Sequence, residues 1–117
     1  MSIAAAHAHQ FFRDVGKSGM VWTIRDDAGF PTSTNPSGET SMPFWSSRKR
    51  AQTIVDTVAA YRGFAPHQLT LSDFIERWLP GLEKDGLRVG INWSGARATG
   101  YDYAPFEVRR FLEGDLE

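Results

Sequence analysis

The sequence predicts an α+β domain in which a small, mainly antiparallel sheet packs against about four helices. Apolar residues recur at three- and four-residue spacing in four segments, which indicates helices. Short β-rich runs lie between these segments and are bounded by glycine, proline and aspartate turns. The resulting order is helix, strands, helix, helix, strands, helix, and a chain of 117 residues fits a single domain, residues 1–117.

The first half of the chain contains one helix and two strands. Apolar spacing predicts a helix over residues 2–17, followed by a strand over residues 20–25. Residues 26–29 have turn composition and predict a hairpin. Residues 31–38, with two prolines and a glycine, are predicted to be a loop, and residues 41–45 a strand that returns to the sheet.

Two helices are expected in the middle of the chain. Ser46 or Ser47 is predicted to cap a helix that extends to about Tyr61. Thr70 and Asp73 resemble a capping box for the next helix. The apolar face of this third helix consists of Leu71, Phe74, Ile75, Trp78 and Leu79.

The last part of the chain is predicted to form a hairpin and a terminal helix. Pro80 should kink or break the third helix, because proline lacks an amide N–H. Residues 87–93 and 99–103 then read as paired strands. A proline favours the first turn of a terminal helix, which we expect to bury Phe106, Phe111 and Leu112.

Composition limits the classes of function. A net charge of −1 makes nucleic-acid binding unlikely. The absence of cysteine excludes disulfides, thiol nucleophiles and thiolate metal sites. No apolar run reaches membrane-spanning length and no signal peptide is recognisable, so we expect a soluble cytoplasmic protein.

Residues 92–101 are the most informative segment. They combine Asn92, Trp93, Arg97 and Tyr101 with two glycines. Glycine permits unusual backbone angles, whereas the aromatic and arginine side chains supply contact area and hydrogen-bond donors. This composition predicts an ordered loop that binds a partner.

Three cations follow two serines at the start of the second predicted helix. Ser46, Ser47, Arg48 and Arg50 could bind an anion there, because the helix dipole otherwise disfavours positive charge at this end. The alternative is a solvated helix face whose arginines pair with nearby carboxylates.

The four tryptophans are expected to divide into two classes. Trp22 and Trp78 lie in regular apolar patterns and are predicted to be core residues. Trp45 and Trp93 each precede a serine at a strand end, where they are expected to lie nearer the surface and close to each other. They could line one pocket with Asn92, or they could simply close the core.

No catalytic, metal or cofactor site is predicted. His7 and His9 lie two residues apart, which on a helix points them in different directions. Asp73 and Glu76 suit the first turn of a helix without any catalytic role. Neither a nucleotide-binding nor a hydrolase motif occurs.

Five short segments carry a family resemblance: residues 21–23, 27–30, 43–47, 74–82 and 89–95. Together they resemble a bacterial family of unknown function, domain-of-unknown-function family 2750. The resemblance covers roughly residues 10–112 and implies a small bacterial α+β domain, but it supplies no activity and no catalytic residue.

The leading hypothesis is a non-enzymatic domain that acts through protein–protein contact, such as an accessory or immunity-type protein. A rigid aromatic-rich surface is typical of interface anchors. The alternatives are a domain that binds a small anionic ligand or a nucleotide and an unrecognised hydrolase. The predicted binding residues are Trp45, Ser46, Ser47, Arg48, Arg50, Asn92, Trp93, Arg97 and Tyr101.

Overall fold

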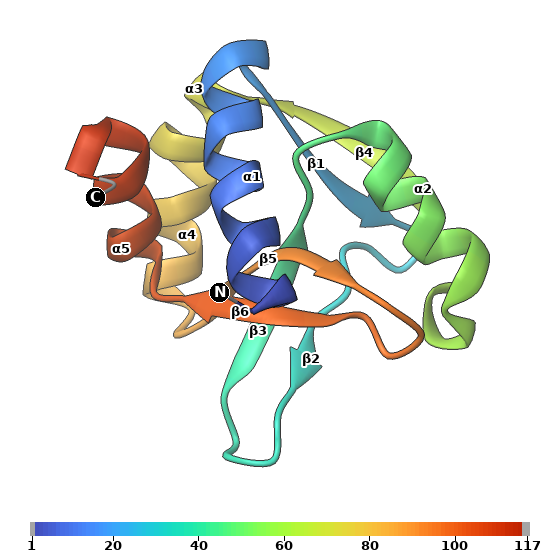
Figure 1. Cartoon of the computed structure of the whole chain (residues 1–117). Helices are drawn as coiled ribbons and strands as arrows, with labels where there is room; N and C mark the ends of the chain where they lie inside the picture. The colour runs from blue at the N-terminus through green and yellow to red at the C-terminus, as the bar shows by residue number, and fades with distance from the viewer. Residues whose placement is uncertain (1, 116–117) are drawn as a thin grey trace.

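The computed structural model describes residues 2–115 and has the α+β fold that the sequence predicts (Figure 1). The strands are β1 (Met20–Arg25), β2 (Ser33–Thr34), β3 (Thr40–Phe44), β4 (Ala65–Thr70), β5 (Arg88–Ser94) and β6 (Thr99–Tyr103). The α-helices are α1 (Ile3–Ser18), α2 (Arg48–Thr57), α3 (Leu71–Asp73), α4 (Leu79–Lys84) and α5 (Pro105–Arg110). Shorter segments are the 3-10 turn η1 (Ala59–Tyr61) and the π-helical turns η2 (Phe74–Trp78) and η3 (Phe111–Asp115).

Within the described residues, the strands form two sheets that meet at a pair of tryptophans. One sheet has the order β2–β3–β5–β6, and the other pairs β1 with β4. β3 and β5 run parallel, whereas the other neighbours are antiparallel. Trp22 and Trp45 exchange two backbone hydrogen bonds, of 2.8 and 2.7 Å, which join the sheets. The end of β3 is therefore a junction of the fold.

The turn after β1 forms, but the hairpin predicted from it does not. Asp26 and Gly29 exchange backbone hydrogen bonds of 3.0 and 3.1 Å. The chain then leaves this sheet, and β1 pairs with β4, where Val21 lies opposite Leu69. Residues 31–38 are mainly exposed and polar, whereas Leu69 adds a buried side chain to the core, so the more distant strand is the better partner.

Helix α1 matches its prediction closely and covers the four-stranded sheet over β5 and β6 (Figure 1). Ser2 caps its start by accepting a 3.0 Å hydrogen bond from the Ala5 amide. Gly19, with a φ of +70°, ends the helix in the left-handed conformation that glycine allows. Of the apolar residues at this spacing, Ala8, Phe11, Phe12 and Val15 are buried, whereas Ala4 is only partly buried.

Helix α2 begins as predicted and ends earlier. Ser47 caps it by accepting a 3.2 Å hydrogen bond from the Arg50 amide. The helix stops at Thr57 because Val58 has an extended backbone, and a 3-10 turn follows up to Tyr61. Val58, just before this turn, and Tyr61, at its end, are both buried in the same hydrophobic cluster.

The third predicted helix is not broken at its proline. Helical residues run from Leu71 through Pro80 to Lys84, with the π-helical turn η2 just before the proline. In this wider turn the Leu79 amide donates to the carbonyl of Phe74, five residues earlier. A π-turn next to the proline accommodates the ring and the missing N–H without ending the helix.

Helix α5 corrects one core prediction. Pro105 and Val108 are buried, and the Glu107 carboxylate accepts a 2.9 Å hydrogen bond from the Ala104 amide at the helix start. Phe106, predicted to point inward, is 58% exposed. Successive helical residues differ by about 100° in direction, so burial of Pro105 and Val108 turns Phe106 outward.

The interior has two hydrophobic clusters. The larger one lies between α1, the four-stranded sheet and the α4–α5 side of the molecule. The smaller one lies beneath α2 and contains Ile24, Trp45, Ala51, Ile54, Val58, Tyr61, Trp93 and Ala98. Among residues 2–115, no helix is long and apolar enough to cross a membrane.

Candidate functional site

Trp45 and Trp93 lie next to each other, but both are buried. Their exposed fractions are 0% and 6%, and Trp45 Nε1 donates a 2.8 Å hydrogen bond to the Trp93 carbonyl. Trp22 and Trp78, predicted to be core residues, are only partly buried. The predicted division of the four indoles is therefore wrong, because the ends of β3 and β5 meet beneath α2 and form a second core there.

Asn92 connects three distant segments and has no free amide group for a ligand. Its φ of +46° lies in the left-handed region, at an irregularity in the β5–β6 pairing. Its Oδ1 accepts from the Ser46 amide at 2.9 Å, and its Nδ2 donates to the His7 carbonyl at 3.0 Å and to Ser46 Oγ at 3.2 Å. Asparagine tolerates this backbone better than most residues.

Ser46 extends the same network to α1. Its Oγ donates to Asp14 Oδ2 at 2.9 Å, and Asp14 Oδ1 accepts from Gln10 Nε2 at 2.6 Å. Ser46 is 5% exposed and Asn92 1%. Both predicted binding residues thus belong to the framework that fixes α1, α2 and β5 relative to one another.

The indole of Trp93 rests against two glycines. A Cβ atom at Gly90 would lie 2.4 Å from Trp93 Cε2 and Cζ2, and one at Gly100 would lie 3.0 Å from Trp93 Cδ1. Trp93 Nε1 donates a 2.9 Å hydrogen bond to Asp102 Oδ1. The ring is held by close packing on one side and by a carboxylate at its edge.

Asp102, on β6, has a carboxyl group whose pKa is shifted by partial burial. Burial raises its pKa above the usual 3.8, while the hydrogen bond from Trp93 and the charge of Arg88 lower it by less. Arg88 donates a 3.0 Å hydrogen bond to the Asp102 carbonyl and lies 3.8 Å from the Glu39 carboxylate. The Asp102 carboxyl group on β6 is therefore partly shielded from water.

The β5–β6 turn has a strained backbone. Apart from glycines, Asn92 and Ala98 are the two residues with positive φ in the described part of the chain, and Ala98 has a φ of +50°. Ala98 is 6% exposed, and its amide donates a 3.0 Å hydrogen bond to the Gly95 carbonyl. Such conformations persist only where the surroundings enforce them, so the turn is ordered by packing.

Two hollows share Trp93 as a lining residue. The first, about 370 Å³, is the α2 groove, lined by Ser47, Lys49, Arg50, Thr53, Ile54, Thr57, Trp93, Ser94 and Gly95. The second, about 410 Å³, is the hairpin pocket, lined by Ser33, Thr34, Asn35, Pro36, Trp93, Arg97, Ala98, Thr99, Gly100 and Asp102.

The predicted binding residues therefore do not form one site. Ser47 and Arg50 line the α2 groove, Arg97 lines the hairpin pocket, and Trp93 lines both. The remaining exposed residues, Arg48 and Tyr101, line neither hollow, while Trp45, Ser46 and Asn92 are buried. Lys49, one of the three cations noted at this helix start, also lines the α2 groove although it was not among the predicted binding residues. Sequence reasoning missed Asp102, because nothing near it distinguishes it from an ordinary strand residue.

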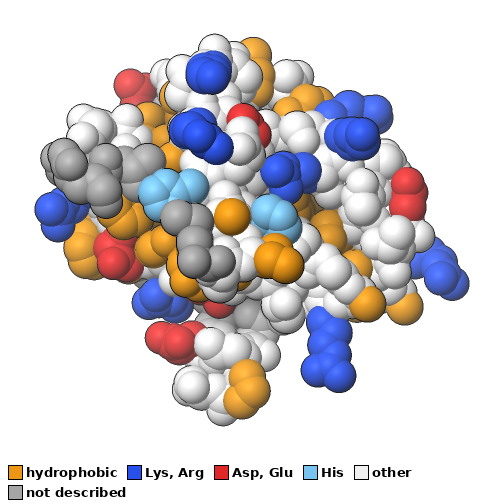
Figure 2. Space-filling model, viewed as in Figure 1, with side chains coloured by type: hydrophobic (Ala, Val, Ile, Leu, Met, Phe, Trp, Pro, Cys, Tyr) orange, Lys and Arg blue, Asp and Glu red, His pale blue; other side chains and the backbone are white. Residues whose placement is uncertain are grey.

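The α2 groove has a positive rim. Between described residues, no ion pair involves Arg48, Lys49 or Arg50, and the first turn of α2 has no acidic residue. Figure 2 shows Lys and Arg side chains spread over α1 and α2 with few acidic side chains among them. The predicted pairing of these arginines with neighbouring carboxylates is not seen among residues 2–115.

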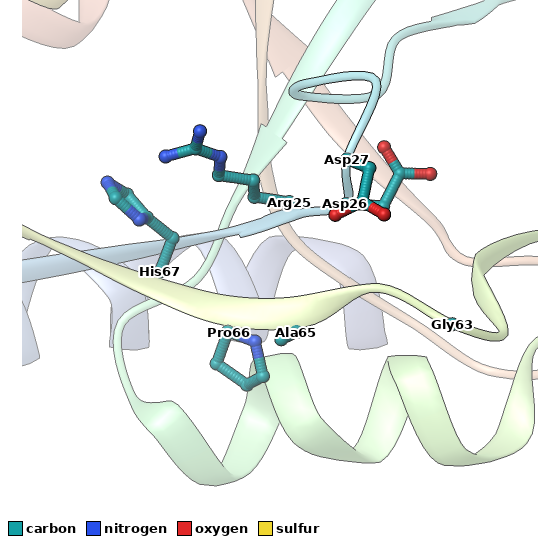
Figure 3. Close-up of a pocket in the computed structure, with 7 residues that line it drawn as sticks. All are labelled: Arg25, Asp26, Asp27, Gly63, Ala65, Pro66 and His67. Atoms are coloured by element: carbon teal, nitrogen blue, oxygen red, sulfur yellow. The ribbon is translucent and has the colours of Figure 1, made fainter.

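A third hollow was not anticipated from the sequence. It lies at the end of the β1–β4 sheet, with a volume of about 700 Å³, and is lined by Arg25, Asp26, Asp27, Gly63, Ala65, Pro66 and His67 (Figure 3). The Arg25 guanidinium lies 5.7 Å from the centre of the Phe30 ring. In Figure 3 the Arg25 and His67 side chains extend to one side of the strands, away from the two carboxylates, so these charges do not converge on one point.

Catalytic geometry is incomplete around the histidine closest to the α2 groove. His7 Nδ1 lies 3.2 Å from Ser94 Oγ. Within the described chain, no carboxylate is hydrogen-bonded to His7, so the pair lacks the third group of a catalytic triad. Residues 2–115 also contain no group of three or more His, Cys, Asp or Glu side chains that could hold a metal ion.

The chain belongs to a family of proteins of unknown function. The family model described as "Protein of unknown function (DUF2750)" matches residues 8–112, as the sequence motifs predict. A search of curated proteins found no match. The family match establishes kinship without assigning a ligand, so the chemistry of the hollows is the basis for function.

Proposed function

We propose that the protein is a non-enzymatic binding domain whose α2 groove captures an acidic segment of a partner protein. The observation that carries this proposal is the set of cations at the groove, which have no ion-pair partner among the described residues. The absence of cysteine fits a reducing cytoplasm, and we propose that the protein acts there.

Charge complementarity selects an acidic partner. Lys49 and Arg50 line the groove and Arg48 is exposed beside them, in a chain whose net charge is −1. The positive charge is thus a local feature and not a property of the whole surface. Each new surface ion pair contributes about 0.2–1 kcal/mol, so several carboxylates are needed for useful affinity.

The floor of the groove favours a peptide over a simple ion. Ile54 and Trp93 supply apolar surface between the cations and the β5–β6 turn. The Thr53 and Thr57 hydroxyls donate to helix carbonyls at 2.9 and 2.6 Å, so their methyl groups add to the apolar surface. A segment with acidic residues around one apolar side chain would satisfy both the rim and the floor.

A rigid groove also lowers the entropic cost of binding. The Asn92–Ser46 hydrogen bonds fix β5 against the start of α2, and the buried Trp93 side chain fixes the opposite wall. Binding to a preformed surface orders fewer protein side chains, which leaves more of the contact energy for affinity.

A matched pair of peptides tests the proposal. The probe is acetyl-EDLFEDL-amide, and the control is acetyl-KRLFKRL-amide, each titrated into ¹⁵N-labelled protein at low salt. We expect the acidic peptide alone to shift amide signals of residues 47–57 and 93–95. Arg50→Glu should weaken binding about tenfold, because it replaces attraction by repulsion at the rim.

Lys84→Glu is the matched control, since Lys84 is an exposed cation on α4, outside the groove. Equal weakening by Lys84→Glu would show that net charge alone attracts the peptide, which would contradict the proposal. If inorganic phosphate at matched ionic strength displaced the peptide completely, a small anionic ligand would replace the peptide as the preferred occupant.

A further inference from the structure

The hairpin pocket carries two opposite charges that are not paired with each other. Asp102 and Arg97 both line it, and no ion pair joins them or includes either one among residues 2–115. Arg97 is exposed on the β5–β6 turn, whereas Asp102 is partly buried on the β6 strand. The two groups therefore come from the same hairpin but differ in their exposure to solvent.

Among residues 2–115, no cation forms an ion pair with the Asp102 carboxylate. Asp102 Oδ1 accepts from the neutral Trp93 Nε1–H at 2.9 Å. The charge of Arg88 acts on this acid, but its guanidinium donates to the Asp102 backbone carbonyl and lies 3.8 Å from the Glu39 carboxylate. The buried Ser41 hydroxyl has no hydrogen bond of good geometry in the described structure.

The walls of the pocket are held in place before any ligand binds. Gly90 and Gly100 leave room for the Trp93 indole, whose position fixes one carboxylate oxygen of Asp102. Ala98 is buried in a left-handed conformation and places the turn that carries Arg97. Two strained residues at Asn92 and Ala98 bracket this wall, and strained backbone of this kind clusters at ligand-binding sites.

We propose that the hairpin pocket binds a small zwitterion of the amino-acid type, with its ammonium group at Asp102 and its carboxylate at Arg97. A simple anion would meet the Asp102 carboxylate, and a simple cation would meet Arg97, so a ligand with both charges is the best match. The volume of about 410 Å³ accommodates a free amino acid.

The remaining lining residues fit such a ligand. Hydroxyls of Ser33, Thr34 and Thr99 can exchange hydrogen bonds with a polar side chain, and Pro36 and Ala98 provide apolar contact. This site is separate from the α2 groove, and its occupation does not depend on the peptide proposed there. Trp93 is the one lining residue common to both hollows.

The test uses the Trp93 indole signal of the ¹⁵N-labelled full chain as the reporter, because this N–H bonds directly to Asp102. L-serine, L-leucine and L-glutamine are titrated one at a time to about 20 mM, well above the constants of weak millimolar ligands. We expect at least one to shift the indole signal saturably.

The charged groups of the ligand are then removed one at a time. N-acetylation of the amino acid that binds should weaken binding about tenfold, as expected for a lost charge-assisted hydrogen bond. Conversion to the amide should weaken it about threefold, because the pair with exposed Arg97 is partly screened. Asp102→Asn should abolish the effect of N-acetylation, and Arg97→Gln should abolish the effect of the amide.

Arg62→Gln is the control, since Arg62 is an exposed cation outside this pocket, and it should change neither effect. The proposal is overturned if none of the three amino acids shifts the Trp93 signal saturably. It is also overturned if the derivatives bind as well as the free amino acid, or if Asp102→Asn and Arg97→Gln leave the derivative effects unchanged.

Discussion

Gly90→Ala should displace the Trp93 indole that separates the α2 groove from the hairpin pocket. The added Cβ would lie 2.4 Å from two ring carbons of Trp93 and 2.6 Å from its Nε1. Real Cβ atoms do not approach other heavy atoms so closely, so the ring or the strand must move. Gly90 does not have a positive φ, and the expected effect is therefore steric and not a consequence of backbone strain.

Three terms give the expected loss of stability. Overpacking in a rigid interior costs about 1–3 kcal/mol. Movement of the ring also breaks the 2.9 Å hydrogen bond to Asp102, which is worth about 1 kcal/mol. Replacing glycine by alanine within a strand otherwise stabilises the folded state by about 0.5 kcal/mol. The free energy of unfolding should therefore fall by roughly 1.5–3.5 kcal/mol.

Two other glycines provide a graded control. Gly100→Ala places a Cβ 3.0 Å from Trp93 Cδ1 and should cost less than Gly90→Ala. Gly81→Ala, in α4, meets no atom within 4 Å and should stabilise the protein by up to about 1 kcal/mol, because alanine favours helix. Urea unfolding followed by circular dichroism would give all three free energies.

A double-mutant cycle identifies the clash itself. In a Trp93→Ala background the ring is absent, and Gly90→Ala should then cost close to nothing. Equal costs in the two backgrounds, or a Gly90→Ala variant as stable as the parent, would refute the close packing of glycine and indole. The walls that we assign to the two hollows would then be wrong as well.

The remaining predictions concern the polar network, the buried acid and the exposed aromatic ring. Asn92→Ala should lower the free energy of unfolding by about 2–4 kcal/mol, because it leaves buried hydrogen-bond partners unpaired and places alanine at a positive φ. Urea unfolding measures this loss, and a value below about 1 kcal/mol would contradict the network. Burial raises the folded-state pKa of Asp102, so its contribution to stability is complete below the unfolded pKa near 3.8 and is lost as the pH rises through the folded value. Relative to the parent, the free energy of unfolding of Asp102→Asn should therefore be higher at pH 7 than at pH 3. Arg88 and Glu39 are the charged neighbours of this acid. The opposite trend would show that desolvation does not dominate its pKa. Phe106→Ala should change thermal stability by no more than about 0.5 kcal/mol because the ring is 58% exposed, and a core-sized loss would restore the inward orientation that the sequence suggested.

Local patterns were enough to predict most of the elements. Apolar spacing located α1, and the caps at Ser47 and Thr70 marked helix starts that the structure contains, with hydrogen bonds of 3.2 and 3.0 Å to the amides three residues later. These features depend on residues within one or two turns of each other. The family membership likewise followed from short motifs.

The errors arose where distant segments compete for the same space. Nothing close to Trp45 in the sequence indicates that its indole will donate to the carbonyl of Trp93, 48 residues later. The outward direction of Phe106 was decided by burial of Pro105 and Val108, although an inward ring fits the apolar composition equally well. Hydrophobicity favours burial but does not specify which apolar side chain obtains the limited interior volume.

The features of the candidate sites also divide into those fixed by local sequence and those fixed by long-range packing. The sequence by itself determined the α+β class and the cluster of cations at the start of α2, because each depends on composition or local spacing. The tertiary structure alone decided that Trp93 would separate two hollows and that Asp102 would face the same pocket as Arg97. Those relations require the parallel pairing of β3 with β5 and the irregular pairing of β5 with β6, and strand pairing over long separations is fixed by packing of the whole chain.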